Sequence, residues 1–431
     1  MRYITYLAIL LALLLMVPSA FGGGAQEADT DEVELLFWGF ADNRNQWYRD
    51  VADLYEEMHP NVTITIETYP YDEMHDQLQT ALVAGTGAPD IADVEISRFS
   101  VFTRGARVGF VPLNDYLTDD QLANLNASAA LDPWTWDGVR YGIGNELNPG
   151  ALYYRWDLLE EAGIETPIET WEEFTEAGQR YVEETGNYFL SVPNVTWGWW
   201  WMVAQAEGGF FDETGDVNFD NEFGQRVLQM FYDWVYVDEI ATLAPGGEYD
   251  SPGQYAALDA GEFAVTMGAP WFQGFMKDNL EETAGLWEMQ EFPIYADGRG
   301  SRTGQWGGTG TMITEQSDHP DVAWDFIQFA NFDVDNLMLA FDRFNLYPTW
   351  VPALEDDRIY EPDPFFNDQR PGEYVERVAG DIPTFYNSPY WPEVTDYFED
   401  FVMDRVLQDE ISLEEAMRVG VEEARDLMED F

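Results

Sequence analysis

The sequence predicts an α/β protein with two lobes, each built on a mostly parallel sheet flanked by helices. The chain has 431 residues, which is more than one hydrophobic core usually organises. Its hydrophobic fraction of 46% is enough for two cores. Strand and helix patterns alternate from the first apolar strand onward, and that alternation is typical of parallel sheets.

The N-terminus has the layout of a secretory signal peptide over residues 1–24. Arg2 precedes an apolar run over residues 6–17, and small residues and glycines follow it. The run is shorter than the roughly 20 residues that span a bilayer, so we expect an exported protein, periplasmic or extracellular. The chain contains no cysteine, which excludes a lipid anchor on cysteine, disulfides and thiolate metal sites.

The charge balance argues against several kinds of partner. The chain carries 82 acidic and 20 basic residues, a formal net charge of −62. A nucleic-acid partner or a polyanionic substrate is disfavoured because phosphate recognition needs a basic surface. The acidic residues are scattered along the chain, which indicates a solvated acidic surface. Such a surface is expected in high salt, where self-repulsion is screened, so we hypothesise a halophilic source.

The first lobe is predicted from five elements in the order strand, helix, strand, helix, strand. They cover residues 33–40, 47–59, 62–69, 72–84 and 89–94. Ligands of such sheets bind beyond the carboxyl ends of the strands. We therefore expect Trp38, Asp42 and Glu95 to lie near a cleft.

A second α/β region is predicted to begin with a strand near residues 152–155. Thr170 with Glu173 three residues later predicts a capped helix over residues 169–184. The glycine-rich segment 298–310 is the best linker candidate. Further helices are expected over residues 223–235, 255–262 and 321–329 and from Pro389 onward, and further strands over residues 263–267 and 311–314.

Motifs for catalysis or metal binding are weak. The segment GTGAPDI at residues 85–91 lacks the spacing of a phosphate loop and predicts a turn between a helix and a strand. The three histidines show no metal-like spacing and are read as surface residues. A glycoside hydrolase stays open as an alternative, because carboxylates and aromatic residues are abundant. We predict no catalytic residue, metal or cofactor.

Tryptophans are the strongest signal. Residues 194–209 hold Trp197, Trp199, Trp200 and Trp201 within five positions. Tryptophan faces stack on the apolar faces of sugar rings, whereas carboxylates and amides bind the hydroxyls. We expect one or two of the four to reach a ligand and Trp201 to pack in the core. Four more tryptophans stand at predicted strand ends or loops, namely Trp38, Trp271, Trp306 and Trp391.

Eight segments in order resemble the extracellular solute-binding proteins of sugar-importing ABC transporters, the maltose-binding-like family 1. They are FWGF (37–40), GTGAPDI (85–91), RVGFVPLNDYL (107–117), DGVRYGI (137–143), ALYYRWDLLEEAGIETPIETWEEF (151–174), AEGGFFDETGDVNFD (206–220), LDAGEFAVTMGAPW (258–271) and GGTGTMIT (307–314). The chain departs from the family where "YGIP" reads YGIG and "YNKDL" reads YRWDL.

The resemblance implies a two-lobe periplasmic-binding-protein fold of class II type, with a hinge between the lobes. The N-terminal lobe would comprise residues 33–143 and 302–345, and the C-terminal lobe residues 146–298 and 346–431. Chain crossings are expected near residues 141–146, 298–306 and 345–348. The implied function is to bind a mono- or oligosaccharide, as a monomer, and to deliver it to a membrane permease. A polyol or cationic ligand is the alternative within binding proteins.

The resemblance and the tryptophan pattern together predict eleven ligand-binding residues. They are Trp38, Asp42, Glu95, Arg98, Glu146, Trp197, Trp199, Trp200, Trp271, Trp306 and Trp391.

Overall fold

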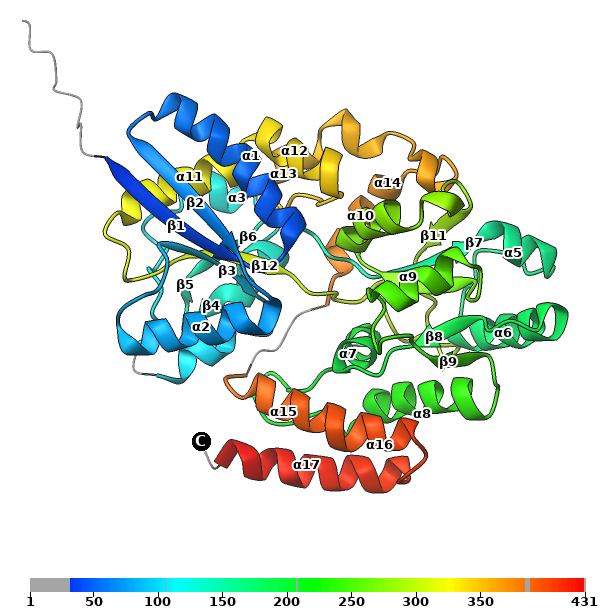
Figure 1. Ribbon diagram of the computed structural model, residues 1–431. Helices are drawn as coiled ribbons and strands as arrows, with labels where there is room; N and C mark the ends of the chain where they lie inside the picture. Colours follow the sequence, from blue (N-terminus) through cyan, green and yellow to red (C-terminus); the bar gives the residue numbers. More distant parts are fainter. Residues whose placement is uncertain (1–31, 106, 207, 384–387, 430–431) are drawn as a thin grey trace, which may run out of the picture.

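The computed structural model describes residues 32–105, 107–206, 208–383 and 388–429. The predicted signal peptide therefore lies outside the described residues. Within them, every helix is too short or too polar to cross a bilayer. Figure 1 shows two lobes, each with a sheet covered by helices.

The first lobe contains a five-stranded sheet in the order β2-β1-β3-β12-β6. Its strands are β1 Val33–Gly39, β2 Val62–Thr68, β3 Ile91–Glu95, β6 Gly142–Gly144 and β12 Thr309–Ile313. Helices α1 Asp42–Met58 and α2 Tyr71–Ala84 follow β1 and β2 as predicted. Trp47, Tyr48, Val51 and Tyr55 are all buried, so one face of α1 packs into the core.

The second lobe is organised around β7 Ala151–Arg155, which pairs antiparallel with β10 Val265–Gly268 and β11 Trp287–Gln290. The short parallel pair β8 Leu190–Val192 and β9 Ala241–Leu243 continues this sheet. It joins β10 because the Phe189 carbonyl accepts hydrogen bonds from the backbone N–H groups of Ala264 and Val265. The flanking helices are α5 Trp156–Glu161, α6 Trp171–Thr185, α8 Glu222–Tyr236, α9 Pro252–Asp259 and α10 Pro270–Asn279.

One strand in each sheet runs against the others. In the first sheet it is β12, which is antiparallel to both β3 and β6. In the second sheet it is β7, antiparallel to β10 and β11. Each of these strands follows directly after the chain has crossed from the other lobe, so it enters its sheet from the hinge side. The prediction of mostly parallel sheets is confirmed with these two exceptions.

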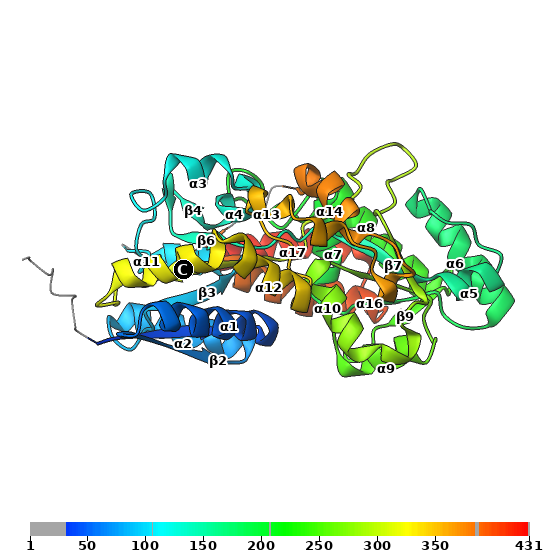
Figure 2. The same cartoon turned by 90° about the horizontal axis from the view of Figure 1, so that it is seen from above.

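The crossing segments lie beside one another at the hinge. Glu146 forms an isolated antiparallel bridge with Pro348, and Pro149 forms one with Gln305. The segment after residue 348 differs from the predicted lobe boundaries, because Trp350 bridges Leu125 of the first lobe. Helices α11 Pro320–Asn331, α12 Val334–Phe344 and α13 Val351–Leu354 form one layer beside α1 (Figures 1 and 2).

The C-terminal helices pack under the second lobe, where α15 Trp391–Tyr397, α16 Asp404–Leu407 and α17 Leu413–Glu429 lie near α8 (Figure 1). Helix α15 also meets the first lobe, since Arg104 donates a hydrogen bond of 2.7 Å to Glu393. Helix α7 Thr196–Ala204 carries the tryptophan cluster and packs against α8. The remaining α-helices and β-strands of the described residues are α3 Asp119–Ala123, α4 Ala127–Ala130, β4 Thr135–Trp136, β5 Val139–Arg140 and α14 Pro371–Val378.

Local signals in the sequence account for several element ends. Thr170 and Glu173 form the predicted capping box at the start of α6. Gly85 ends α2 in the left-handed region at φ 71°, so the GTGAPDI segment is the predicted turn. Phe110 forms an isolated antiparallel bridge with Thr314.

Candidate functional site

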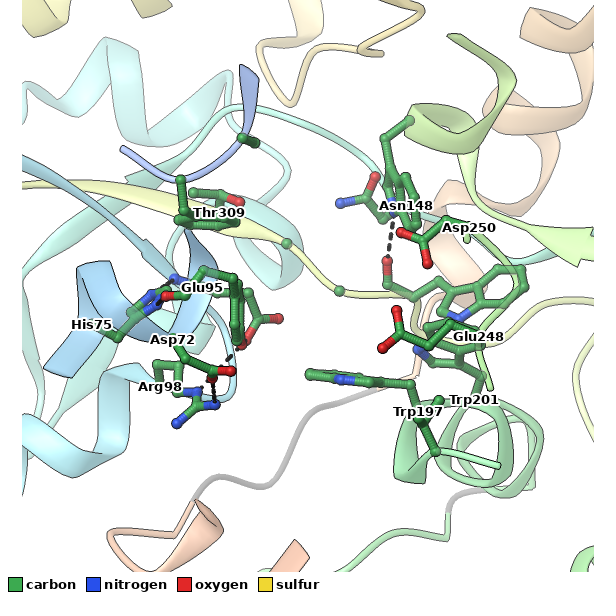
Figure 3. A pocket seen from close by; sticks show the side chains of 18 of the residues that line it. Asp72, His75, Glu95, Arg98, Asn148, Trp197, Trp201, Glu248, Asp250 and Thr309 are labelled. Carbon is green, nitrogen blue, oxygen red and sulfur yellow. Dashed lines mark hydrogen bonds and ion pairs between the residues drawn. The ribbon is translucent and has the colours of Figure 1, made fainter. Parts of the chain in front are cut away.

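A cleft of about 1020 Å³ lies between the lobes and is lined by residues of both. The first lobe contributes the start of α1, helix α2 and the segment after β3. The second lobe contributes α7, the loop 248–250 and the start of α10. Figure 3 shows Asp72, His75, Glu95 and Arg98 on one side of this space, and Trp197, Trp201, Glu248 and Asp250 on the other.

Arg44 organises the floor of the cleft at the hinge. This buried guanidinium lies 3.1 Å from Asp93 and 3.2 Å from Glu146, and it donates a 2.6 Å hydrogen bond to Asn145. Burial alone would lower the pKa of Arg44, but Asp93 and Glu146 raise it, so the group stays charged. Burial also raises the pKa of Glu146, against the effect of Arg44. The floor therefore holds a hydrogen-bonded group of charges that links the first lobe to the crossing segment.

Glu95 ends β3 and is held from one side only. Its Oε2 accepts hydrogen bonds from the Ser97 backbone N–H at 2.8 Å and from the Tyr71 hydroxyl at 3.0 Å. Its Oε1 is buried and has no hydrogen-bond partner among the described residues. Burial raises the pKa of Glu95 to about 7, although Ser97, Tyr71 and Arg98 oppose the shift. One carboxylate oxygen is thus fixed and the other is left for a further partner.

His75 positions Glu95 from the adjacent helix. Its Nδ1 lies 2.7 Å from the Tyr71 carbonyl, and its Nε2 accepts the backbone N–H of Glu95 at 3.1 Å. Nδ1 must therefore carry the proton. Burial lowers the pKa of His75 to about 3, so the ring is neutral at ordinary pH. The prediction that the histidines lie on the surface is wrong for His75, because it sits on the buried face of α2 beside Met74 and Leu78.

The opposite wall is aromatic, and α7 supplies most of it. Trp197 and Trp201 are one helical turn apart, so both face the cleft. Trp201 stacks on Tyr249 at 6.1 Å and meets Trp306 edge to face at 3.8 Å. Gly304 allows this approach, since a Cβ there would lie 2.5 Å from the Trp201 carbonyl oxygen. Trp271 completes the wall by donating a 3.2 Å hydrogen bond to the Trp306 carbonyl.

A carboxylate pair borders the aromatic wall. Glu248 and Asp250 follow β9 in a loop that opens onto the cleft. Partial burial raises the pKa of Glu248 to about 7, and the neighbouring Asp250 and Glu399 and the facing Asp72 add to the shift. Glu399 is itself engaged, because it accepts the N–H of Thr196 at the start of α7 at 2.8 Å. Glu248 therefore stands among other carboxylates, which disfavour its ionised form.

Five buried polar atoms that belong to cleft-lining side chains make no hydrogen bond among the described residues. They are Arg44 Nη2, Glu95 Oε1, Asn148 Oδ1, Trp201 Nε1 and Trp306 Nε1. Buried polar groups are nearly always satisfied in folded proteins. Unsatisfied donors and acceptors around one cavity are what a polar ligand would engage, and they support such a ligand here.

Six of the eleven predicted residues line the cleft. They are Glu95, Arg98, Glu146, Trp197, Trp271 and Trp306. Arg98 is tied to its own lobe, since it donates a 2.6 Å hydrogen bond to Asp72 and lies over the Tyr71 ring. The structure thus brings together residues from β3, the hinge, α7 and α10.

The other five predicted residues lie outside this cleft. Trp38 is buried in the first lobe, where its Nε1 donates to Glu67 at 3.1 Å, and Asp42 is exposed at the first residue of α1. Trp199 packs in the second core and donates to the Gly224 carbonyl at 2.9 Å. Trp200 and Trp391 meet edge to face at 5.6 Å and line a small cavity of about 60 Å³ that adjoins the cleft and shares Trp197 with it.

Trp201 reverses the expectation that it packs in the core. It is only partly buried and lines the cleft, whereas Trp199 is fully buried. Helix α7 is apolar on all sides, so its sequence carries no amphipathic signal that separates the two faces.

Several lining residues were not predicted, in particular Arg44, Tyr71, Asn148, Glu248 and Asp250. Arg44 carried a usable signal, because basic residues are scarce in this chain and it follows the first strand closely. Glu248 and Asp250 follow a glycine pair, which marks a loop but not its direction. Among the described residues, no three histidine, aspartate or glutamate side chains are grouped so as to hold a metal ion.

Comparisons with known proteins agree with this architecture. The profile of the bacterial extracellular solute-binding protein family matches residues 41–333. The chain is 33% identical over 403 residues to an arabinooligosaccharide-binding protein of Halalkalibacterium halodurans, covering 90% of this chain and 88% of that one. It is 27% identical to an arabinooligosaccharide-binding protein of Bacillus subtilis, covering 93% of each.

A solved structure shares the fold. The GacH receptor of Streptomyces glaucescens, solved unliganded and in complex with acarbose, superposes with a TM-score of 0.78 at 21% identity, covering 93% of this chain and 99% of that one. The two-lobe fold, the match to the family profile and the full-length relatives lead to one assignment. The chain belongs to the bacterial extracellular solute-binding protein family.

Proposed function

We propose that the protein is the extracytoplasmic receptor of a sugar ABC importer, which binds an oligosaccharide between its lobes and delivers it to the membrane permease. It is exported by the signal peptide over residues 1–24 and works as a monomer in the periplasm or outside the cell. It carries no lipid on cysteine and performs no catalysis. Its acidic surface suits a salt-rich medium.

The observation that carries this proposal is the set of unsatisfied polar atoms in the cleft. Leaving a buried donor or acceptor without a partner costs about 1–3 kcal/mol. The set contains acceptors such as Glu95 Oε1 and donors such as Trp306 Nε1. A sugar hydroxyl donates one hydrogen bond and accepts others, so a few hydroxyls satisfy both kinds.

The aromatic wall and the size of the cleft support a saccharide of several units. Trp197 and Trp201 offer indole faces next to the polar floor, which suits rings with apolar C–H faces. The volume of about 1020 Å³ is at the upper end of the roughly 300–1,000 Å³ typical of ligand pockets. Because two full-length relatives are named for arabino-oligosaccharides, this class is the first candidate.

Closure of the lobes would complete the site. The two sides of the cleft come from different lobes, and the hinge strands run beneath them. A ligand that contacts both walls stabilises the closed form by its differential affinity for that form. Closure also removes water, which strengthens hydrogen bonds to Glu95 and Asn148.

The pairing of Glu146 with Arg44 argues against the glycoside hydrolase alternative, which needs two carboxyl groups free to act on the glycosidic bond. Glu95 is held through Oε2 by Ser97 and Tyr71, so its Oε1 is oriented toward a ligand. A sensitive assay for reducing sugar released from arabinan should therefore stay negative.

Calorimetric titration of the exported protein against a saccharide panel tests the proposal. The panel contains α-1,5-arabino-oligosaccharides, malto-oligosaccharides, galacto-oligosaccharides, free arabinose, a polyol and choline. We expect one saccharide series to bind with one site per chain, and tryptophan emission to shift in parallel. If only the polyol or only choline binds, the saccharide assignment is wrong and the ligand belongs to that other class.

A further inference from the structure

The cleft carries an excess of negative charge, which the binding of a neutral sugar does not require. Nine carboxylates and three guanidinium groups line it among the described residues. Each guanidinium is already paired, since Arg44 contacts Asp93 and Glu146, Arg98 contacts Asp72, and Arg104 contacts Glu393. The only lysine of the chain, Lys277, is engaged by Asn345 and Asp363 and is not among the cleft-lining residues.

Carboxylates that form no ion pair among the described residues stand on both walls. Asp76 lies on α2 of the first lobe, one turn after the paired Asp72, and Glu248 and Asp250 lie on the loop of the second lobe. Asp72 contributes to the raised pKa of Glu248, so carboxylates on the two walls repel each other across the cleft. Closure brings the walls together and excludes water, which strengthens the negative electrostatic potential in the cleft.

The same cavity holds buried polar groups that point to a ligand. Glu95 is 7% exposed and Asn148 is 3% exposed, and both have unpartnered polar atoms. Figure 3 shows the Trp197 ring extending into the space beside Glu248. An indole face next to a carboxylate favours a positive or neutral group over a negative one.

We propose that the cleft selects saccharides by charge, accepting neutral and amine-bearing oligosaccharides and rejecting those that carry a carboxylate, sulfate or phosphate. Glu248 and Asp250 are the specificity-determining residues, because they face the open part of the cleft and have no cationic partner among the described residues. The inference rests on the proposed function for the ligand class and adds a rule for the ligand's charge.

Three end-modified forms of one sugar test this rule. α-1,5-Arabinotriose is reduced to its alditol, oxidised to its aldonate, or converted to its 1-amino-1-deoxyalditol, which gives neutral, negative and positive ligands of one length. Dissociation constants are measured by calorimetry at low and at molar salt. We expect the aldonate to bind more weakly than the amine by on the order of tenfold or more at low salt, and the gap to narrow at molar salt.

Variants assign the effect to the carboxylate pair. The double variant Glu248→Gln, Asp250→Asn should reduce the ratio of the dissociation constants of the aldonate and the amine. Asp250→Asn alone serves the same purpose if the double variant misfolds. Glu282→Gln removes one charge at an exposed site away from the cleft and should leave the gap unchanged.

Two results would overturn the charge rule while leaving saccharide binding intact. One is equal affinity for the aldonate and the amine at low salt, and the other is an affinity difference that is unchanged in the double variant. If arabinotriose fails but another neutral oligosaccharide binds, the same three derivatives of that sugar are used. If no neutral oligosaccharide binds, the proposed function and the charge rule both fall.

Discussion

Trp199 and Trp201 are two residues apart on the same helix and have opposite surroundings. Trp199 is fully buried between Phe210 and Phe398, and its Nε1 donates to a backbone carbonyl. Trp201 is only partly buried, its Nε1 has no partner among the described residues, and its ring borders the cleft. The two residues therefore differ both in exposure and in whether the indole N–H has a partner, and the two differences together mark Trp201 as part of the site.

Replacing Trp199, whose indole N–H has a partner, should have the largest effect, and that effect should be on stability. Trp199→Ala should lower the free energy of unfolding by about 3–5 kcal/mol, because it opens a cavity in the second core. Urea denaturation measures this loss, and Trp199→Phe serves as the milder control. The fraction that stays folded should bind saccharide with nearly unchanged affinity. A loss of saccharide affinity with unchanged stability would show that Trp199 belongs to the site and would contradict its assignment to the core.

Replacing Trp201, whose indole N–H has no partner among the described residues, should instead weaken binding. Trp201→Ala should cost about 2 kcal/mol in binding, roughly thirtyfold in the dissociation constant, because it deletes a ring face and a donor. Calorimetry with the best saccharide of the panel measures the loss. Trp201→Phe keeps a ring but removes the Nε1–H, so an intermediate affinity would divide the effect between stacking and hydrogen bonding. A folded alanine variant that binds like the wild type contradicts the assignment.

Glu95 extends the comparison to a titratable group. Burial raises its pKa from 4.5 to about 7 in the folded state. The stability that it contributes is therefore fully present below about pH 4.5 and is lost as the pH rises through about 7. Glu95→Gln removes this dependence, so the variant should gain stability relative to the wild type between about pH 5 and about pH 8. Denaturation curves at several pH values give the free energy of unfolding of both proteins as a function of pH. If the two pH dependences are parallel, Glu95 ionises normally and the prediction is wrong.

Trp38 should give the smallest effect, although the sequence predicts it as a ligand contact. Its indole N–H already donates to Glu67, and it packs on Tyr69 away from the cleft. Trp38→Phe should change saccharide affinity by less than about twofold, while unfolding free energy falls by about 1 kcal/mol through the lost hydrogen bond. A strong loss of affinity would mean that the ligand reaches beyond the cleft described above.

Sequence patterns predict the elements well where the chain is amphipathic. Helices α1, α2, α6 and α8 each have one apolar face, so their periodicity marks them. Helix α1 begins at Asp42, five residues before the predicted start, because Ala41 at its N-cap offers no side-chain signal. That error hides Arg44, which the earlier start turns inward toward the hinge.

The site is less predictable because its residues lie in segments buried on several sides. The last three residues of β1, from Phe37 to Gly39, are buried in succession, so alternation does not tell whether Trp38 points toward ligand or core. Helix α7 is apolar all round, and only the packing of Phe210 and Phe398 decides which tryptophan is covered. Loop residues such as Glu248 are placed by tertiary contacts that local sequence does not encode.

A crystal structure of the protein with α-1,5-arabinotriose tests the central claim most directly. The sugar should lie between the lobes with a ring against Trp201 or Trp197. Its hydroxyls should come within about 2.5–3.2 Å of Glu95 Oε1 and the Asn148 amide, so that the unsatisfied atoms gain partners. A saccharide bound elsewhere, or one in the cleft that leaves those atoms unpartnered, would contradict the account.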